Sequence, residues 1–552
     1  MLTTLLIWVY ICFILLAYGH GMLRFLSRAF DLDLSAQVSL PILALLGLCA
    51  LNILAAVLSL FLPLGLEANI ILLAGAFFLV KPAWIYVRSQ PRFIFSWKYF
   101  LLVGIAFVII LENSTHIPVD PDTNLYHAQM IHWLEAYRTV PGLGNLHTRL
   151  AFNSNWLVLN ALFSFAFLGF RSFHLLPGFL FLISILYFSS GFIELTRGSI
   201  TNSAIIKTIL LPLSFHIWAS ELSSPGTDLP TSLLIWVALI IWLESSETTQ
   251  PKTFRIIAFI LSLTAVTFKV SAFPLLLLPI FLWLKNLKNK NFKFAGAMAL
   301  FVFLCWSPWF ARNFITSGYW IYPVPALIPI SPIVDWQIPP DTVVHELDGI
   351  QTWARQFTLK ADLDSSRFLD WFPFWFSRQT LSQRLLLLVS ILLPPFFGFY
   401  SIFKRRMPDI VHITAYAGVL FWFFTVPTIR FGYGFLIMIV LLIFAVPLRA
   451  IIKRIKRSST TGTVLQVAVI LYLGYILYGS MECSTFYRRL YLPEDYRVFS
   501  TTPCEIANAT IQCAAKYNQC GYQAFPCVVK AFSNIELRGD DWQDGFRILS
   551  TP

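Results

Sequence analysis

The chain has 552 residues, of which 57% are hydrophobic and only 12% are charged. A soluble domain of this size could not bury so much apolar surface, and repeated apolar runs approach the length that crosses a bilayer. The formal net charge of +12 would suit a nucleic-acid partner, but Lys and Arg fall mainly in short loops between apolar runs. That distribution is the positive-inside pattern, so we expect a polytopic membrane protein without a nucleic-acid partner.

The first apolar run, from Leu2 to about Tyr18, has no basic residue before it and no small-residue cleavage site after it. We therefore expect an uncleaved helix with its N-terminus outside, and not a signal peptide. With the further apolar runs, the sequence predicts about fourteen membrane crossings in total, within a range of about 13 to 15. They lie at 37–62, 67–87, 99–112, 173–193, 204–219, 229–244, 254–269, 271–285, 293–310, 384–403, 410–426, 430–450 and 464–481.

Basic clusters mark the cytoplasmic loops of this predicted all-α transmembrane bundle. They are Lys285–Lys293, Lys404–Arg406, Lys453–Arg457 and the group Arg88, Arg92 and Lys98. Counting outward from them places the loops 113–152 and 311–383 and the tail 482–552 on the extracytoplasmic side. A crossing at 153–169 would reverse every later loop, so this segment is expected to dip in or to lie at the interface. The sequence thus predicts a transmembrane domain at 1–481 and an extracytoplasmic tail at 482–552.

Four of the eight cysteines lie well inside the tail, and their spacing is not a paired C-x-x-C zinc pattern. Two disulfides in an oxidising compartment are expected in preference to a zinc site, with three pairings left open. This expectation agrees independently with an extracytoplasmic tail. The tail cysteines are Cys504, Cys513, Cys520 and Cys527, with Cys483 at the start of the tail, whereas Cys12, Cys49 and Cys305 lie in apolar runs and are expected in the core.

The polar stretch 112–156 interrupts these apolar runs and carries most of the candidate chemistry. It contains two carboxylates, Asp120 and Asp122, held in a turn by Pro121. Asp122 stands at the N-cap position of a predicted helix over TNLYHAQMIHWLEAYR. An N-cap residue can have only the structural role of starting the helix, or it can also be a catalytic base, and the sequence leaves both roles open.

That helix is expected to be amphipathic and to lie on the membrane. Its apolar residues recur at helical spacing, at Tyr126, Met130, Trp133 and Tyr137. His127 and His132 are five residues apart, so they do not share a face as a metal-binding pair would.

The segment after the helix, Pro141-Gly-Leu-Gly-Asn-Leu-His147-Thr-Arg149, has glycines that permit a tight turn. It lacks the Gly-Lys-Ser/Thr of a P-loop, so nucleotide binding is not predicted. Arg149 suits either a phosphate contact or an anchor at the membrane interface.

Four further ionisable residues interrupt apolar runs near the predicted outer face: Asp228, Lys269, Arg312 and Arg430. Ionisable groups at helix ends usually face a cavity, and cations gathered at one depth suit an anionic lipid substrate. Each of them could also be an end residue that reaches into the interface. The long outer loop 311–383 is expected either to bind or cover a substrate, or to be anchored in the interface by its aromatic run FLDWFPFWF.

These features resemble the GT-C class of membrane glycosyltransferases, multi-spanning proteins that transfer sugars from polyprenyl-phosphate carriers on the outer face. In that class the first large outer loop carries an acidic motif ahead of an amphipathic helix. Asp122-Thr-Asn-Leu-Tyr126 looks like that motif, with Thr123 in place of the second acid. DTNLYHAQMIHW, VPGLGNLHTRLAFNSNW and RNFITSGYWIYP also look like a largely uncharacterised family of bacterial membrane proteins found among surface-polysaccharide functions, a likeness that covers about residues 100–450.

The resemblance implies inverting glycosyl transfer at the outer face of the bacterial inner membrane, with a polyprenyl-phosphate-linked sugar as donor. Asp122 would be the general base, and Asp120 would supply the second carboxylate. Cations would stabilise the departing phosphate, and the implied set is Arg149, Lys269, Arg312 and Arg430. The other implied substrate contacts are Tyr126, His127, His147, Asn153 and Asp228. No protein ligand set for a metal is implied, and a divalent cation is an open alternative.

Three other functions fit parts of the same pattern. A polysaccharide polymerase or ligase would use a lipid-linked glycan as donor, and the acceptor that would identify it is not visible in the sequence. A lipid-linked glycan transporter would use the same cationic cavity, but paired broken helices in two matching halves are not apparent. A structural assembly protein would not need the acidic turn. The expected acceptor is a glycan, lipid or protein, in contact with membrane lipids.

Overall fold

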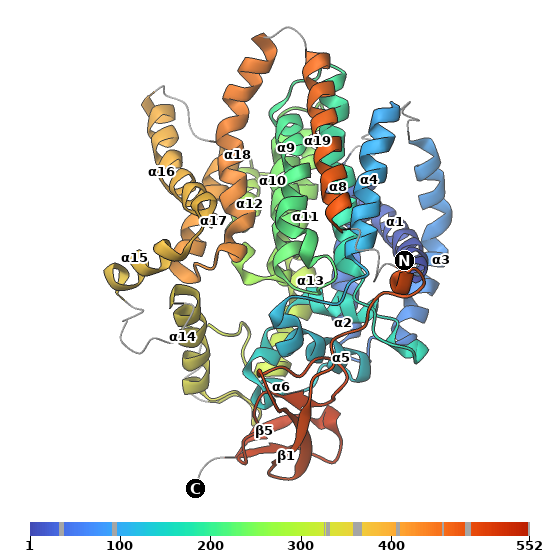
Figure 1. The fold of residues 1–552 in the computed structure, drawn as a ribbon, viewed down its shortest axis with the longest axis vertical. Coiled ribbons are helices and arrows are strands. Elements are labelled where there is room, and N and C mark those ends of the chain that lie inside the picture. Colours follow the sequence, from blue (N-terminus) through green and yellow to red (C-terminus); the bar gives the residue numbers. More distant parts are fainter. Residues whose placement is uncertain are drawn as a thin grey trace.

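The protein is a bundle of long helices with a small β-containing tail at one end, as the computed structural model shows (Figure 1). The structure describes residues 1–32, 38–90, 96–324, 326, 332–356, 367–403, 409–454, 458–480 and 487–549. Several residues used to predict sidedness or disulfides lie outside these ranges: Arg92, Lys404, Arg405, Arg406, Lys456, Arg457 and Cys483.

Within these ranges, eleven helical spans are long and apolar enough to cross a membrane. They are formed by α1 (Leu2–Phe30), α2 (Leu40–Leu58), α3 (Leu66–Ser89), α8 (Leu176–Thr196), α9 (Asn202–Trp218), α11 (Pro251–Phe268), η5 with α12 (Val270–Leu276, Leu277–Lys288), α13 (Phe292–Ser317), α16 (Leu381–Phe403), α18 (Ile429–Arg454) and α19 (Ser458–Ser480). The expectation of a polytopic helical membrane protein is therefore confirmed. The first helix runs well beyond its predicted end near Tyr18.

Three shorter helices run among these spans: α4 (Trp97–Asn113), α10 (Asp228–Glu244) and α17 (Ile410–Thr425). Every predicted crossing coincides with one of the helices named so far. If the shorter three also cross, the chain crosses about fourteen times, as the hydropathy predicts.

The segment 153–169 does not continue through the bundle, as predicted. It forms the short helix α7 (Asn155–Leu162), and all of its residues are buried. The chain then returns to the end from which it came, because His174 Nε2 lies 3.1 Å from the His116 carbonyl oxygen and Arg171 donates a 2.8 Å hydrogen bond to the Pro493 carbonyl. We call this end of the bundle, where the tail also packs, the loop end, and the opposite end the far end.

Close packing of α1 against α2 depends on two glycines. A Cβ at Gly19 would lie 2.0 Å from the carbonyl oxygen of Leu43, and one at Gly47 would lie 2.0 Å from that of Leu15. Small residues of this kind let transmembrane helices approach closely enough for extensive van der Waals contact.

The polar loop after α4 forms short helices at the loop end. They are the π-turn η1 (Thr123–His127), α5 (Ala128–Ala136), α6 (Leu143–Leu146) and η2 (Thr148–Ala151). The predicted amphipathic helix is present in η1 and α5, but its apolar face does not rest on a membrane surface. Trp133 is buried, and its ring packs 4.8 Å from that of Phe525 in the tail. The tail therefore covers the face that the sequence assigns to lipid.

The long loop 311–383 is divided between the two alternatives. Its helix α14 (Pro340–Gln356) carries Glu346 to the other polar loop, where Glu346 accepts a 2.6 Å hydrogen bond from Thr148. Its helix α15 (Phe368–Arg378) contains the aromatic run, and Trp371 and Trp375 are buried against Phe423 of α17. One half thus reaches the polar region, and the other half is an aromatic anchor.

The tail corrects the all-α prediction, because it contains two small sheets. Strands β1 (Thr501–Ile506) and β2 (Ala509–Ala514) are antiparallel, and β3 (Cys527–Val528) pairs with β2 in parallel. A second antiparallel pair is β4 (Ile535–Leu537) with β5 (Phe546–Ile548). The two expected disulfides are present and join neighbours in sequence, Cys504 to Cys513 and Cys520 to Cys527. Such short strands carry too little periodicity to be predicted.

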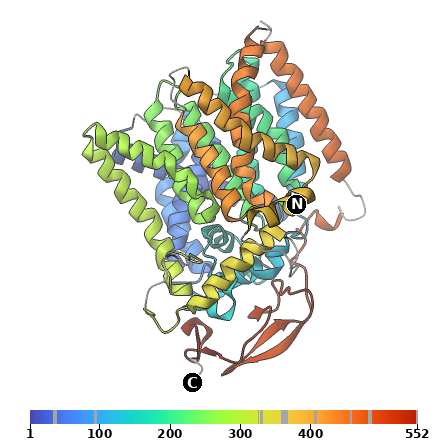
Figure 2. The same cartoon turned by 90° about the vertical axis from the view of Figure 1, so that its left-hand side faces the viewer.

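The tail is fixed to the bundle at its first residues. Arg489 and Glu112 form an ion pair of 2.9 Å, and each side chain is only 1% exposed. The amide of Leu2 donates to the carbonyl of Leu490, so the start of α1 and the start of the tail are also joined. From there the tail continues beneath the bundle, where both views show it beside the polar loops (Figures 1 and 2).

Candidate functional site

The turn that holds the two acidic residues is fixed by backbone hydrogen bonds. The hydroxyl of Ser224 accepts from the amides of Val119 and Asp120, at 3.0 and 3.1 Å. Asp120 Oδ1 in turn accepts from the amide of Asp122 at 3.0 Å. Asp122 precedes η1 as predicted, but its side chain makes no capping hydrogen bond. The interpretation of Asp122 as a helix cap alone is therefore wrong, and its carboxylate is turned to other partners.

Arg430, in the first turn of α18, joins three carboxylates. Its Nη1 lies 3.3 Å from Asp120 Oδ1, its Nη2 contacts Asp122 Oδ2, and its Nε lies 3.1 Å from Asp228 Oδ2. Asp228 is the first residue of α10, so this single guanidinium connects the acidic turn with two helices of the bundle. A fork of fixed donors is well suited to such multiple contacts.

Two more cations extend the cluster. Lys269 pairs with Asp228, and its Nζ lies 3.4 Å from the ring centroid of Phe431. Arg149 lies between two acids, with Nη1 3.6 Å from Asp122 Oδ1 and Nε 3.6 Å from Glu346 Oε1. We call these residues the charged site: Asp120, Asp122, Arg149, Asp228, Lys269, Glu346 and Arg430.

The two acids of the turn differ in protonation. Burial raises the pKa of the Asp120 carboxyl to about 6, and the negative charge of Asp122 adds to the rise. Burial acts in the same direction on Asp122, but the surrounding positive charges outweigh it and hold the pKa of Asp122 below its usual range. The positive form of His127 is the largest of these lowering causes at Asp122, followed by Arg430, Arg149 and Lys269. Burial lowers the pKa of His127 itself to about 4, so its ring is neutral at pH 7. Asp122 is therefore an ionised carboxylate at neutral pH.

Uncharged and aromatic groups border the charged site. The Tyr126 ring centroid lies 5.9 Å from the guanidinium carbon of Arg149 and 5.8 Å from the Phe152 ring. His127 is buried, and neither ring nitrogen has a hydrogen-bond partner among the described residues. Burial also lowers the pKa of His147 to about 4, and its Nδ1 accepts from the Arg149 amide at 3.2 Å. A buried imidazole without a partner has hydrogen-bonding capacity left for a ligand.

Arg312 and Asn153, which the sequence places among the substrate contacts, form a separate structural clamp. Arg312 is fully buried and donates to Asn153 Oδ1 at 2.9 Å, to Ser59 Oγ at 2.6 Å and to Thr139 Oγ1 at 3.0 Å. Asn153 also donates to the Trp309 carbonyl at 2.7 Å. These bonds join α13 to the polar loop and to the end of α2. No ion pair connects either residue to the charged site within the described ranges, so we leave both outside it.

A cavity of about 340 Å³ adjoins the charged site. Arg149 and Glu346 belong to both the charged site and the cavity wall. Asp122 does not line the cavity, but its side chain is 25% exposed, contacts Arg149 and follows Pro121, which does line it. The cavity's lining residues come from the two polar loops and from the tail. The full lining is Pro121, Leu125, His147, Thr148, Arg149, Glu346, Tyr517, Asn518, Gln519 and Val529.

The described residues contain no group of three or more His, Cys, Asp or Glu side chains arranged to hold a metal ion. In the charged site, the guanidinium of Arg430 occupies the position among Asp120, Asp122 and Asp228 that a cation would take. The four tail cysteines are joined in disulfides and are not available as zinc ligands.

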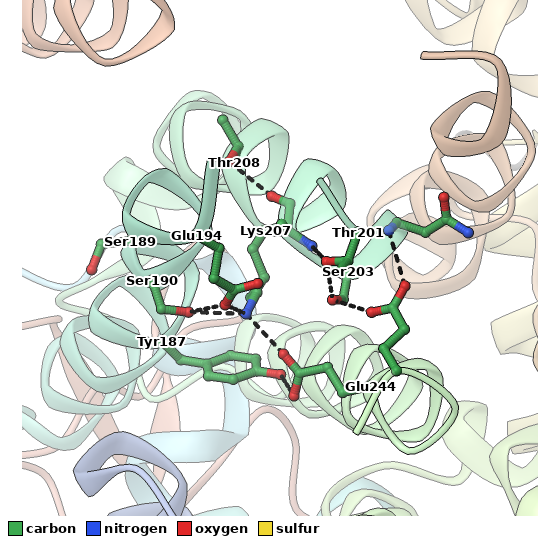
Figure 3. Close-up of polar contacts among 12 residues, drawn as sticks. Tyr187, Ser189, Ser190, Glu194, Thr201, Ser203, Lys207, Thr208 and Glu244 are labelled. Atoms are coloured by element: carbon green, nitrogen blue, oxygen red, sulfur yellow. Dashed lines mark hydrogen bonds and ion pairs between the residues drawn. The ribbon is translucent and has the colours of Figure 1, made fainter. Parts of the chain in front are cut away.

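A second polar cluster, at the far end of the bundle, was not predicted from the sequence (Figure 3). Lys207 of α9 contacts Glu194 of α8, and it donates to Glu244 of α10 at 2.8 Å and to Ser190 at 3.0 Å. Tyr187 completes the cluster with a 2.9 Å hydrogen bond to Glu244. The three helices are thereby joined through one buried ammonium group. The signal was available, because Lys207 interrupts an apolar run, but its partners cannot be inferred without the fold.

The fold and the charged site define a polytopic helical membrane protein with a carboxylate and cation cluster at the end where its disulfide-bonded tail packs. The family model described as "Domain of unknown function (DUF8201)" matches residues 1–437, so the chain belongs to that family. No curated protein and no solved structure matches the chain. The matched region includes every residue of the charged site, from Asp120 to Arg430, whereas the tail lies beyond it.

Proposed function

We propose that the protein is an integral membrane glycosyltransferase of the GT-C type. It transfers a sugar from a polyprenyl-phosphate carrier at the extracytoplasmic face of the bacterial inner membrane, in the assembly of surface polysaccharide or glycoconjugate. The observation that carries this proposal is Asp122, an ionised carboxylate beside a cavity. It is surrounded by Arg149, Lys269 and Arg430 at the boundary between apolar helices and polar loops.

In this mechanism Asp122 accepts the proton of an acceptor hydroxyl. The hydroxyl oxygen forms a bond to the anomeric carbon, and the bond from that carbon to the carrier phosphate breaks. Polyprenyl phosphate leaves with the bonding electron pair, and the configuration at the anomeric carbon is inverted. Asp120 is a second carboxylate beside this base, and its pKa of about 6 lets it take up a proton in mildly acidic solution.

The cations stabilise the negative charge that develops on the leaving phosphate. Arg430 and Lys269 are paired with Asp228 in this structure, and a phosphate would compete for the same donors. Guanidinium groups bind phosphate through paired hydrogen bonds, which makes Arg430 the strongest candidate for the phosphate contact. His127 and Tyr126 lie next to these groups and can hydrogen-bond sugar hydroxyls.

A turnover assay tests the proposal. Protein in lipid nanodiscs is mixed with a panel of polyprenyl-phosphate sugars, and release of polyprenyl phosphate is measured. The comparison is between wild type, Asp122→Asn and the control Asp341→Asn, whose carboxylate lies on exposed α14 and lines no part of the cavity. We expect wild type and control to release the carrier and Asp122→Asn to be slower by about 100-fold or more.

Full activity of Asp122→Asn would refute the role of Asp122 as the base. If no donor is turned over while a lipid-linked oligosaccharide still binds, the protein is instead a polymerase, a ligase or a transporter. A polymerase or ligase would release a carrier diphosphate or phosphate from that oligosaccharide in the same assay, and a transporter would release neither.

A further inference from the structure

Residues of the tail form part of the wall of the cavity beside the charged site. Tyr517, Asn518 and Gln519 are consecutive residues of this wall, and Arg149 and Glu346 line the same cavity from the polar loops. The wall is held against the polar loop by backbone hydrogen bonds, because the amides of Cys520 and Gly521 donate to the carbonyl of Asn124 at 3.0 and 2.9 Å. These bonds hold the backbone directly after the three residues against the loop that carries Asp122.

Side chains of this wall are free to meet a ligand. Tyr517 is 84% exposed, although it is a large aromatic residue. Tyr517 and Asn518 both have positive φ, at 62° and 54°, a conformation that is rare for non-glycine residues. No side-chain hydrogen bond of Tyr517, Asn518 or Gln519 is found among the described residues. Two amides and a phenol thus have unused donors and acceptors.

The part of the lining that the polar loops supply is also polar. Arg149, Glu346, Thr148 and His147 offer charged and neutral hydrogen-bonding groups to the same space. A cavity of about 340 Å³ lies at the small end of the range for small-molecule sites. An aromatic face with amides on one side and charged donors and acceptors on the other suits a ring rich in hydroxyl groups. It does not suit an acyl chain, for which the wall offers little apolar area, or a folded protein surface, which needs a larger contact.

Only one part of the cavity lining lies in the region that the family model matches. Arg149 and Glu346 lie inside the matched region 1–437, and the tail wall lies outside it. The charged site thus lies inside the matched family domain, whereas the tail adds a wall from outside it. A wall that is separate from the reacting groups is placed to select a substrate and not to carry out the chemistry.

We infer that this cavity is the acceptor subsite, and that the acceptor is a glycan held by its sugar ring between the tail wall and Arg149 with Glu346. The name acceptor rests on the proposed glycosyltransferase activity. The inference that the cavity binds carbohydrate does not depend on that activity. Tyr517 contacts the face of the ring, and Asn518 and Gln519 bond its hydroxyl groups. An acceptor hydroxyl is thereby brought to the side of the cavity where Asp122 lies.

A direct binding measurement tests whether the cavity holds carbohydrate, and it needs no turnover. Full-length protein in nanodiscs is titrated calorimetrically with three uncharged trisaccharides, namely chitotriose, maltotriose and mannotriose. Variants Tyr517→Ala and Asn518→Ala remove groups of the wall. Their matched controls are Phe532→Ala and Lys516→Ala, an exposed aromatic and an exposed polar residue of the tail that do not line the cavity. Both disulfides are checked by mass spectrometry in every variant.

We expect at least one trisaccharide to bind wild type and both controls equally, and to bind Tyr517→Ala about tenfold more weakly, the loss expected for one aromatic contact. Asn518→Ala should weaken the same trisaccharide. If none of the three binds, or if the wall variants bind as tightly as the controls, the inference is wrong. Loss of activity in Asp122→Asn with unchanged trisaccharide binding would leave both statements standing. Carbohydrate binding without any carrier release would refute the glycosyltransferase and not the subsite.

Discussion

Replacement of Arg489 by Met tests how the tail is held on the bundle. Arg489 and Glu112 are both almost fully buried and lie 2.9 Å apart. Removal of one member of a buried ion pair costs about 3–5 kcal/mol, because the other charge keeps its desolvation penalty without a partner. His116 Nε2 lies 2.8 Å from the same carboxylate and compensates part of the loss. We therefore expect about 3 kcal/mol, which raises the population of undocked tail about 100-fold.

Hydrogen exchange measures that population directly. The amides of Cys520 and Gly521 are bonded to the carbonyl of Asn124, so they exchange when the tail leaves the loop. In Arg489→Met they should exchange about 100-fold faster than in wild type, while amides inside the bundle keep their rates. The double variant Arg489→Met with Glu112→Gln removes both charges and should restore most of the protection. Unchanged exchange in the single variant, or equal exchange in the single and double variants, would refute this account of docking.

Three further predictions concern the charged site, a buried carboxyl group and a disulfide of the tail. Arg430→Ala should weaken binding of a polyprenyl-phosphate sugar about tenfold, because a charge-assisted hydrogen bond is lost. Lys288→Ala, at the far end, should leave the dissociation constant unchanged. Equal dissociation constants for the two variants would contradict the phosphate contact. Burial raises the pKa of Glu135 to about 7 from the ordinary 4.5, so this group stabilises the fold below pH 4.5 and loses that contribution as pH rises to 7. Over this window the free energy of unfolding of Glu135→Gln should change by about 2 kcal/mol less than that of wild type, because Asp120 titrates in both proteins; equal changes in the two proteins would contradict the cause. Replacing Cys520 and Cys527 by Ser should destabilise the tail by about 2 kcal/mol in urea unfolding, since the closed loop is short, and an unchanged midpoint would exclude a stabilising disulfide.

The helices were predictable from the sequence because a membrane helix is a local property. About twenty apolar residues suffice to define each crossing, and no long-range contact is needed. The non-crossing segment 153–169 was predictable for a different reason, since the positions of basic loops constrain all crossings together. The tail strands were not predictable, because β3 has only two residues and its pairing with β2 depends on the fold.

The charged site was predictable in its members but not in its contacts. Asp122, Asp228 and Arg430 each interrupt an apolar or turn segment near the same depth, which is why depth alone brought them into one set. That Arg430 joins the three acids could not be predicted, because the partners are separated by hundreds of residues. Arg312 shows that a residue can carry the same sequence signal and still lie outside the charged site. It has the same sequence signal, but hydroxyl and amide groups bind its guanidinium, and neutral partners leave no mark in a charge pattern.

The contact between the tail and the start of α1 has a consequence for biosynthesis. Because the tail follows α19, it leaves the ribosome only after these membrane helices have been made, and its amide partners at Leu2 and Thr3 belong to α1, which is made before the other helices of the bundle. Its disulfides span nine and seven residues, so they can form within the tail before docking. The nascent chain therefore completes its acidic turn early and gains the last wall of the cavity at the end. Conditions that slow docking of the tail would leave a full-length protein whose cavity is still open on one side.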